Sequence, residues 1–99
     1  MILHITAVEY LHDYKLAVTF DKGSSGIADL TDILDLGLFK SLRDTGLFSQ
    51  VTVDDQMKTV VLSNGLDLAP EYVYFQAFKD DPRYRAQFEA WGYAEQSAA

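Results

Sequence analysis

The segment between Ser63 and Pro70 constrains the fold of this chain more than any other. Asn64 and Gly65 stand between two apolar runs, and an Asn-Gly pair in that position predicts a β-hairpin turn of type I′, in which both residues have a positive φ. Pro70 then suits the first turn of a helix, where its missing N–H costs nothing. A strand is therefore expected to reverse, return briefly and lead into a helix.

The predicted turn and cap residues of this segment are Asn64, Gly65, Asp67 and Pro70. A short carboxylate after a tight turn invites a functional interpretation of Asp67 as well as a structural one. Aspartate in such places commonly accepts hydrogen bonds from nearby backbone N–H groups. A structural role, in which Asp67 fixes the approach of the chain to Pro70, is therefore favoured.

Alternating apolar residues predict strands in the first third of the chain. Leu16, Val18 and Phe20 lie on one face of an extended segment, as in a strand with one buried side. Residues 21–26 have the composition of a loop and separate this strand from the next. The three strands of the predicted antiparallel meander are residues 2–10, 14–20 and 27–30.

Beyond Leu30 the spacing of the apolar residues becomes helical. We expect Thr31 or Asp32 to cap a first short turn that Gly37 closes, then a second short helix, then a further turn that starts at Asp44. The later predicted elements are strands at 50–54 and 59–62, a helix at 70–78, and a last helix that runs from Pro82 to Gly92.

These elements together predict an α+β protein. Its expected parts are an antiparallel three-stranded meander plus a β-hairpin, covered by short helices, with a C-terminal amphipathic helix. A chain of 99 residues is long enough for one compact core. We therefore expect residues 1–79 to form a single α+β domain, and residues 80–99 to be a C-terminal helical extension of that domain.

An aromatic face marks the last predicted helix. Asp81 is a candidate N-cap ahead of Pro82, and Tyr84, Phe88 and Trp91 follow at the spacing of one helical face. Such a face either packs on the core of its own chain or forms a contact surface for another, because aromatic residues are enriched at interfaces. Both interpretations stay open, and the second includes a homodimer.

Charge and composition exclude several classes of function. The formal net charge is −7, from 15 acidic against 8 basic residues, which argues against direct binding of nucleic acid or of an anionic membrane surface. The absence of cysteine excludes disulfides, thiol catalysis and cysteine metal ligands. Neither a signal peptide nor an apolar run of membrane-spanning length is recognisable, so a cytoplasmic location is expected.

No motif with a known chemistry stands out, so no catalytic, cofactor-binding or metal-ligating residue and no cofactor are predicted. His4 and His12 lack the spacing of a metal site. Asp29, Asp32 and Asp35 would share one face of a continuous helix and could bind a divalent cation or act as an acid–base pair. That face is broken if Asp29 ends a strand and Asp32 caps a helix, which is the expected arrangement.

The pattern of these residues resembles a small bacterial family catalogued as domain of unknown function 2442. Its most specific part in this chain is the block Asn64-Gly65-x-Asp67-Leu68-Ala69-Pro70-Glu71. Leu62-Ser63 departs from the Trp-Pro that commonly precedes Asn-Gly in the family. Further matching residues are Ile5, Val8, Asp13, Tyr14, Leu16, Val18, Phe20, Asp29, Leu30, Gly37, Phe39, Leu42, Asp44, Phe48, Val51, Val53, Asp54 and residues 59–61.

The resemblance implies a small α+β domain without an established enzymatic activity. Some relatives carry a helix-turn-helix domain after this module, and others look like partners of small proteins in arrangements similar to toxin–antitoxin pairs. We therefore expect a non-enzymatic interaction or regulatory module, the acidic partner of a small basic, toxin-like protein, with Tyr84, Phe88 and Trp91 as the contact. The alternative is a small-ligand or divalent-metal-dependent enzyme that uses clustered aspartates, Asp29 and Asp67 among them.

Overall fold

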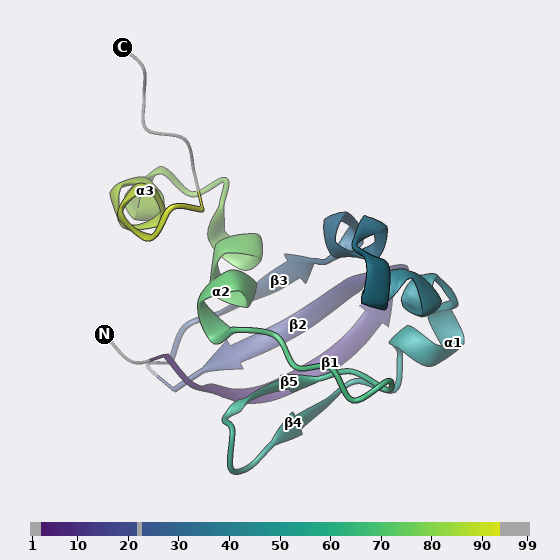
Figure 1. Ribbon diagram of the computed structural model, residues 1–99. Coiled ribbons are helices and arrows are strands. Elements are labelled where there is room, and N and C mark those ends of the chain that lie inside the picture. The colour runs from purple at the N-terminus through teal and green to yellow at the C-terminus, as the bar shows by residue number, and fades with distance from the viewer. Residues whose placement is uncertain (1–2, 22, 94–99) are drawn as a thin grey trace.

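The computed structural model describes residues 3–21 and 23–93 and shows two antiparallel sheets (Figure 1). Three strands lie in the order β1-β2-β3 and form the predicted meander, while β4 and β5 form the predicted hairpin. This confirms the α+β prediction. The strands are β1 (Ile5–His12), β2 (Lys15–Phe20), β3 (Ser25–Asp29), β4 (Thr52–Asp54) and β5 (Thr59–Val61).

The period-two pattern of β2 separates a buried face of the meander from an open one. Leu16, Val18 and Phe20 are fully buried, and Val18 faces Val8 of β1 across the ladder. On the opposite face Ile27 of β3 is 56% exposed. The core therefore lies on one side of the three-stranded sheet, as the alternation predicts.

Short helices cover the buried side. Figure 1 places η1, η2 and α1 together at one end of the sheet, α2 against the sheet near β3, and α3 beyond α2, away from the sheet. The helices are η1 (Thr31–Asp35), η2 (Gly37–Arg43), α1 (Thr45–Phe48), α2 (Pro70–Phe78), η3 (Pro82–Tyr84) and α3 (Arg85–Trp91), where η marks a 3₁₀ helix.

The expected caps of the first helical turn are wrong. Neither Thr31 nor Asp32 caps η1; Leu30 holds the N-cap position without a side-chain bond. Asp29, the last residue of β3, instead accepts hydrogen bonds from the backbone N–H of Thr31 (3.0 Å) and from its hydroxyl (2.6 Å). Gly37 begins η2 rather than closing η1, because the tight 3₁₀ turn ends at the extended residue Leu36.

The Asn-Gly turn is a hairpin of a different type from the one expected. Gly65 has a φ of +86°, but Asn64 is not among the residues with positive φ, so the turn is not type I′. The N–H of Gly65 donates to the carbonyl of Leu62 (2.9 Å), and the N–H of Leu62 donates to the carbonyl of Leu66 (2.8 Å). This is the pattern of a three-residue loop, a type I turn followed by a left-handed glycine.

The side chain of Asn64 joins the turn to a segment far away in sequence. Its side-chain amide donates to the carbonyl of Leu38 in η2 (3.0 Å), and its side-chain oxygen accepts from the N–H of Leu66 (3.1 Å). After the turn the chain returns along β5, where Asp67 pairs with Val61. It then enters α2 at Pro70, as predicted.

Helix α2 is the central element of the packing. None of its nine residues is exposed, and Val73, Tyr74 and Gln76 are buried. Its C-terminal end lies so close to β3 that a Cβ added to Gly26 would sit 3.2 Å from the Phe78 ring. Glycine at this position therefore allows the helix to approach the sheet.

Candidate functional site

The predicted aromatic face packs on its own chain. Phe88 is 1% exposed, and its ring centroid lies 5.1 Å from that of Phe75 in α2. Tyr84 lies 5.5 Å and Trp91 6.1 Å from the ring centroid of Tyr74. For Phe88 the structure thus shows packing within the chain. A contact with a partner stays a prediction for the accessible parts of Tyr84 and Trp91, which are half-buried.

We call η3 and α3 together the aromatic extension. The residues predicted to begin and end it, Asp81 and Gly92, hold those positions. The Asp81 carboxylate accepts from the N–H of Arg83 (2.9 Å) at the start of η3, and a side-chain hydrogen bond from Arg83 lowers the pKa of Asp81. Gly92 ends α3 in the left-handed conformation, with a φ of +83°. Tyr93 then stacks on Phe75 at 5.5 Å. Residues 94–99 of the predicted extension lie outside the described residues, as do residues 1 and 2.

A groove between η1, η2 and the start of α2 was not foreseen from the sequence. Its volume is about 240 Å³. Leu36 lies between the two 3₁₀ helices in an extended conformation and is 57% exposed, and the neighbouring Leu38 is 75% exposed. We call this feature the groove; it is lined by Ile33, Leu36, Phe39, Asp67, Leu68, Ala69 and Tyr72.

Negative charge accompanies the apolar lining of the groove. Asp67 is exposed at the groove, and its carboxylate accepts no hydrogen bond from any of the described residues. Burial raises the pKa of Tyr72, the hydrogen bond from Gln76 opposes that rise, and the charge of Asp32 adds to it. One carboxylate, that of Asp67, therefore lines an apolar surface that is open to solvent.

The structural role expected of the Asp67 carboxylate finds no support in these contacts. The backbone of residues 67 and 68 is held by other groups. Asp67 forms a bridge with Val61, the N–H of Leu68 donates to the carbonyl of Val60 (3.1 Å), and the buried Thr59 hydroxyl donates to the carbonyl of Leu68. The segment is thus fixed without the carboxylate.

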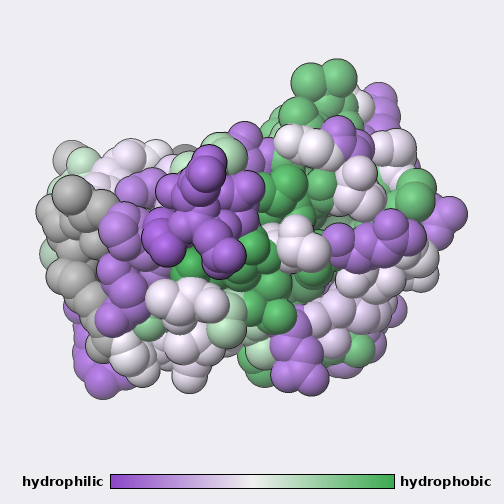
Figure 2. Space-filling view, turned by 90° about the horizontal axis from the view of Figure 1, so that it is seen from below, coloured by the Kyte–Doolittle hydropathy of each residue, from purple (hydrophilic) through white to green (hydrophobic). Residues whose placement is uncertain are grey.

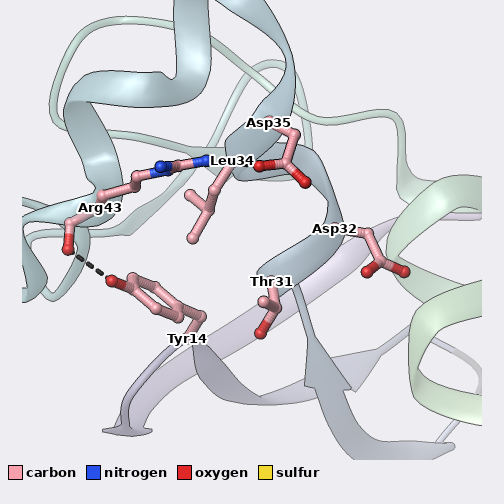
Figure 3. A pocket seen from close by; sticks show the side chains of 6 residues that line it. All are labelled: Tyr14, Thr31, Asp32, Leu34, Asp35 and Arg43. Atoms are coloured by element: carbon pink, nitrogen blue, oxygen red, sulfur yellow. Dashed lines mark hydrogen bonds and ion pairs between the residues drawn. The ribbon is translucent and has the colours of Figure 1, made fainter.

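A second, smaller pocket of about 190 Å³ lies on the other side of η1 (Figure 3). The Tyr14 hydroxyl donates to the backbone carbonyl of Arg43, and the Arg43 guanidinium forms an ion pair with Asp35. Asp32 lies apart from this pair and points toward α2 (Figure 3). The pocket is lined by Tyr14, Thr31, Asp32, Leu34, Asp35 and Arg43.

The three aspartates at positions 29, 32 and 35 do not form a common site. Asp29 is bound to Thr31, and these hydrogen bonds, the one from the hydroxyl above all, lower the pKa of Asp29. Asp35 is paired with Arg43. Within residues 3–21 and 23–93, no group of three histidine, aspartate or glutamate side chains converges on a possible metal position.

The histidines have acidic neighbours on the surface. His4 Nδ1 lies 3.3 Å from Asp21, and His12 Nδ1 lies 3.1 Å from Asp13. Each contact joins one imidazole to one carboxylate, and neither contains a third titratable group. The arrangement is that of isolated side-chain contacts on the surface.

One sequence signal could have revealed the groove. The segment Leu36-Gly37-Leu38-Phe39 places three large apolar residues within four positions, more than one buried face of a short helix can hold.

Exposed apolar side chains also occur elsewhere. Figure 2 shows a hydrophobic band, bordered by hydrophilic side chains, on the face seen from below. The exposed large hydrophobic residues are Leu11, Ile27, Leu36, Leu38, Leu47 and Met57.

The chain is similar to a known family and to a solved structure. The model of the family described as "Protein of unknown function (DUF2442)" matches residues 5–79. A solved structure from Nitrosomonas europaea, described as a "Putative DNA Binding Protein", matches with a TM-score of 0.73 and 21% identity. The match covers 92% of this chain and 61% of that one, and it shows a shared fold. The search of curated proteins found no match.

The model also bears on the membrane. Across the described ranges, no helix combines the length and the apolar character that crossing a bilayer requires.

Proposed function

The chain belongs to the DUF2442 family, whose description assigns no activity, and we propose that it is a non-enzymatic domain that binds a basic protein through the groove. The observation that carries this proposal is the open apolar lining, with Leu36 at 57% exposure. The free energy falls when a partner covers an apolar side chain that was exposed to water. The groove presents its apolar side chains on a concave surface, which a partner of complementary shape can fill.

Charge supports a basic partner. The chain carries a net charge of −7, and Asp67 lines the groove. Complementary charge speeds association and selects among partners. A small basic, toxin-like protein has the required sign of charge. A homodimer through the groove would instead bring this carboxylate toward that of a second copy.

The description of the Nitrosomonas europaea neighbour raises the question of DNA. For this chain we propose that any contact with DNA runs through another protein, because 15 acidic residues outnumber 8 basic ones. A gel-shift assay of the isolated chain tests this point. Tight binding that weakens steeply with salt would contradict it.

The alternative of an enzyme with clustered aspartates gains no support from the contacts. Asp29 is engaged by Thr31, and Asp35 by Arg43. Titration calorimetry with Mg²⁺ and Mn²⁺ tests it directly. Stoichiometric heat that disappears in Asp29→Asn would revive this alternative.

The proposal is tested by affinity capture of the tagged full chain from its native lysate. We expect one basic protein in stoichiometric amount, lost in Leu36→Asp and retained in Met57→Asp. Met57 is a matched control because it is 52% exposed and does not line the groove. Retention by Leu36→Asp would contradict the proposal. Loss in Trp91→Ala alone would move the contact to the aromatic extension.

A further inference from the structure

We infer that the groove recognises one large apolar side chain that lies next to a cationic group, and that Asp67 pairs with that cation. The inference rests on the proposed function, since it names the chemistry of the partner at the same site. It is carried by the size of the groove and the apolar character of its lining. The position of the one carboxylate among the lining residues completes it.

The size of the groove fits a single anchoring side chain. A volume of about 240 Å³ lies below the roughly 300–1,000 Å³ typical of pockets for whole small ligands. Ile33 and Leu68 are buried and form its floor, while Leu36 and Tyr72 remain accessible along its walls. Interfaces commonly gain most of their affinity from one or a few such anchors in a pocket.

The backbone around Asp67 is held in place before any partner arrives. The bridge to Val61 fixes residue 67, and the bonds from Leu68 to Val60 and from the Thr59 hydroxyl to Leu68 fix the next residue. A carboxylate on such a rigid segment loses little freedom when it binds. Binding of a cation at this position therefore costs little conformational entropy.

The carboxylate of Asp67 is available for a cation. It forms no ion pair with any residue in the described ranges, whereas Asp35, on the far side of η1, is paired with Arg43. Asp32 lines the pocket on the other side of η1, so Asp67 is the carboxylate that the groove itself presents. An ammonium or guanidinium group above the groove would thus lie beside the Asp67 carboxylate and near the ring of Tyr72, which also attracts cations.

Nuclear magnetic resonance titration of the full chain tests this inference with two probes. Tryptamine and indole-3-acetate share an indole ring but carry opposite charges. We expect tryptamine to shift the resonances of Leu36, Phe39 and Tyr72, and to bind about tenfold more tightly than indole-3-acetate, because only tryptamine forms a charge-assisted hydrogen bond.

Two variants assign the charge effect to one residue. Asp67→Asn should bring the affinities for the two probes within about twofold of each other, since the apolar contact remains and the charge is lost. Asp55→Asn, at an exposed acid in the turn between β4 and β5, should leave the preference for tryptamine unchanged. Equal affinity of the two probes for the unmodified chain would overturn the inference, as would an unchanged preference in Asp67→Asn.

The outcome separates this inference from the proposed function. Capture of a partner that depends on Leu36, without a preference for tryptamine, would overturn the inference alone. A preference that depends on Asp67, without any captured protein, would support the recognition chemistry and refute the protein partner.

Discussion

Different kinds of side chain hold the sheet against α2 and hold the aromatic extension, formed by η3 and α3, against the same helix. The sheet side is closed by fully buried residues such as Leu16, Val18 and Val73. The extension is attached through rings that contact α2 and are largely half-buried, and Figure 1 shows α3 away from the sheet. Helix α2 serves both parts. Phe88 of α3 nevertheless belongs to the same buried cluster as the sheet residues, and we predict that the extension can open while the sheet stays folded.

The largest expected effect on stability comes from a substitution in the core beside the sheet. Phe48 is fully buried and packs edge-on against Tyr14 at 5.3 Å and Tyr10 at 6.1 Å. Phe48→Ala should lower the free energy of unfolding by about 3–5 kcal/mol, because a large cavity forms between α1 and the sheet. Urea denaturation followed by circular dichroism measures this loss. A loss below about 1 kcal/mol would place Phe48 outside the core.

The matched change in the extension should act locally. Phe88→Ala is expected to cost about 2–3 kcal/mol at α3, which opens without unfolding the sheet. Hydrogen exchange should then rise over residues 85–91 while residues 15–20 keep their protection. Exchange that rises equally in both segments would show that the two regions unfold as one unit.

A change in β3 where it contacts the shared helix α2 should loosen both regions. Gly26→Val places a branched side chain where even a Cβ lies 3.2 Å from Phe78 and 3.3 Å from Ala77. We expect a loss of about 2 kcal/mol, because α2 must move away from β3. Thermal unfolding measures it, and Ile27→Val, one residue along on the exposed face, is the control.

The smallest expected effect is a loss of stability at alkaline pH. Burial, with a contribution from Tyr84, raises the pKa of Tyr74 to about 12, and Tyr74 lies where α3 meets α2. The folded state holds this proton more tightly than the unfolded state, so its contribution to stability is complete below pH 10 and lost as the pH rises through 12. Absorbance titration at the tyrosinate band should show a tyrosine that titrates at about pH 12 and that is lost in Tyr74→Phe.

Much of the fold could be predicted from local signals. The alternation of Leu16, Val18 and Phe20 and the punctuation by Pro70, Asp81 and Gly92 act over a few residues. The elements they predict are present, except that the last predicted helix is divided into η3 and α3. These signals suffice because each depends on the backbone of its own segment.

The missed features depend on contacts between distant segments. The side-chain amide of Asn64 donates to the carbonyl of Leu38 in η2, a contact that local turn signals do not contain. The groove forms only when η1 and η2 meet the segment that leads into α2. Neither periodicity nor spacing can place residues 36 and 67 on one surface.

Site-specific photocrosslinking in the native cells tests the central claim, that a partner binds at the groove and not at the extension. A photoreactive residue at position 38 lies beside the groove without lining it, and one at position 90 lies on the exposed side of α3. The account predicts a covalent adduct with one basic protein at position 38 and none at position 90. An adduct at position 90 alone, or none at position 38, would contradict it.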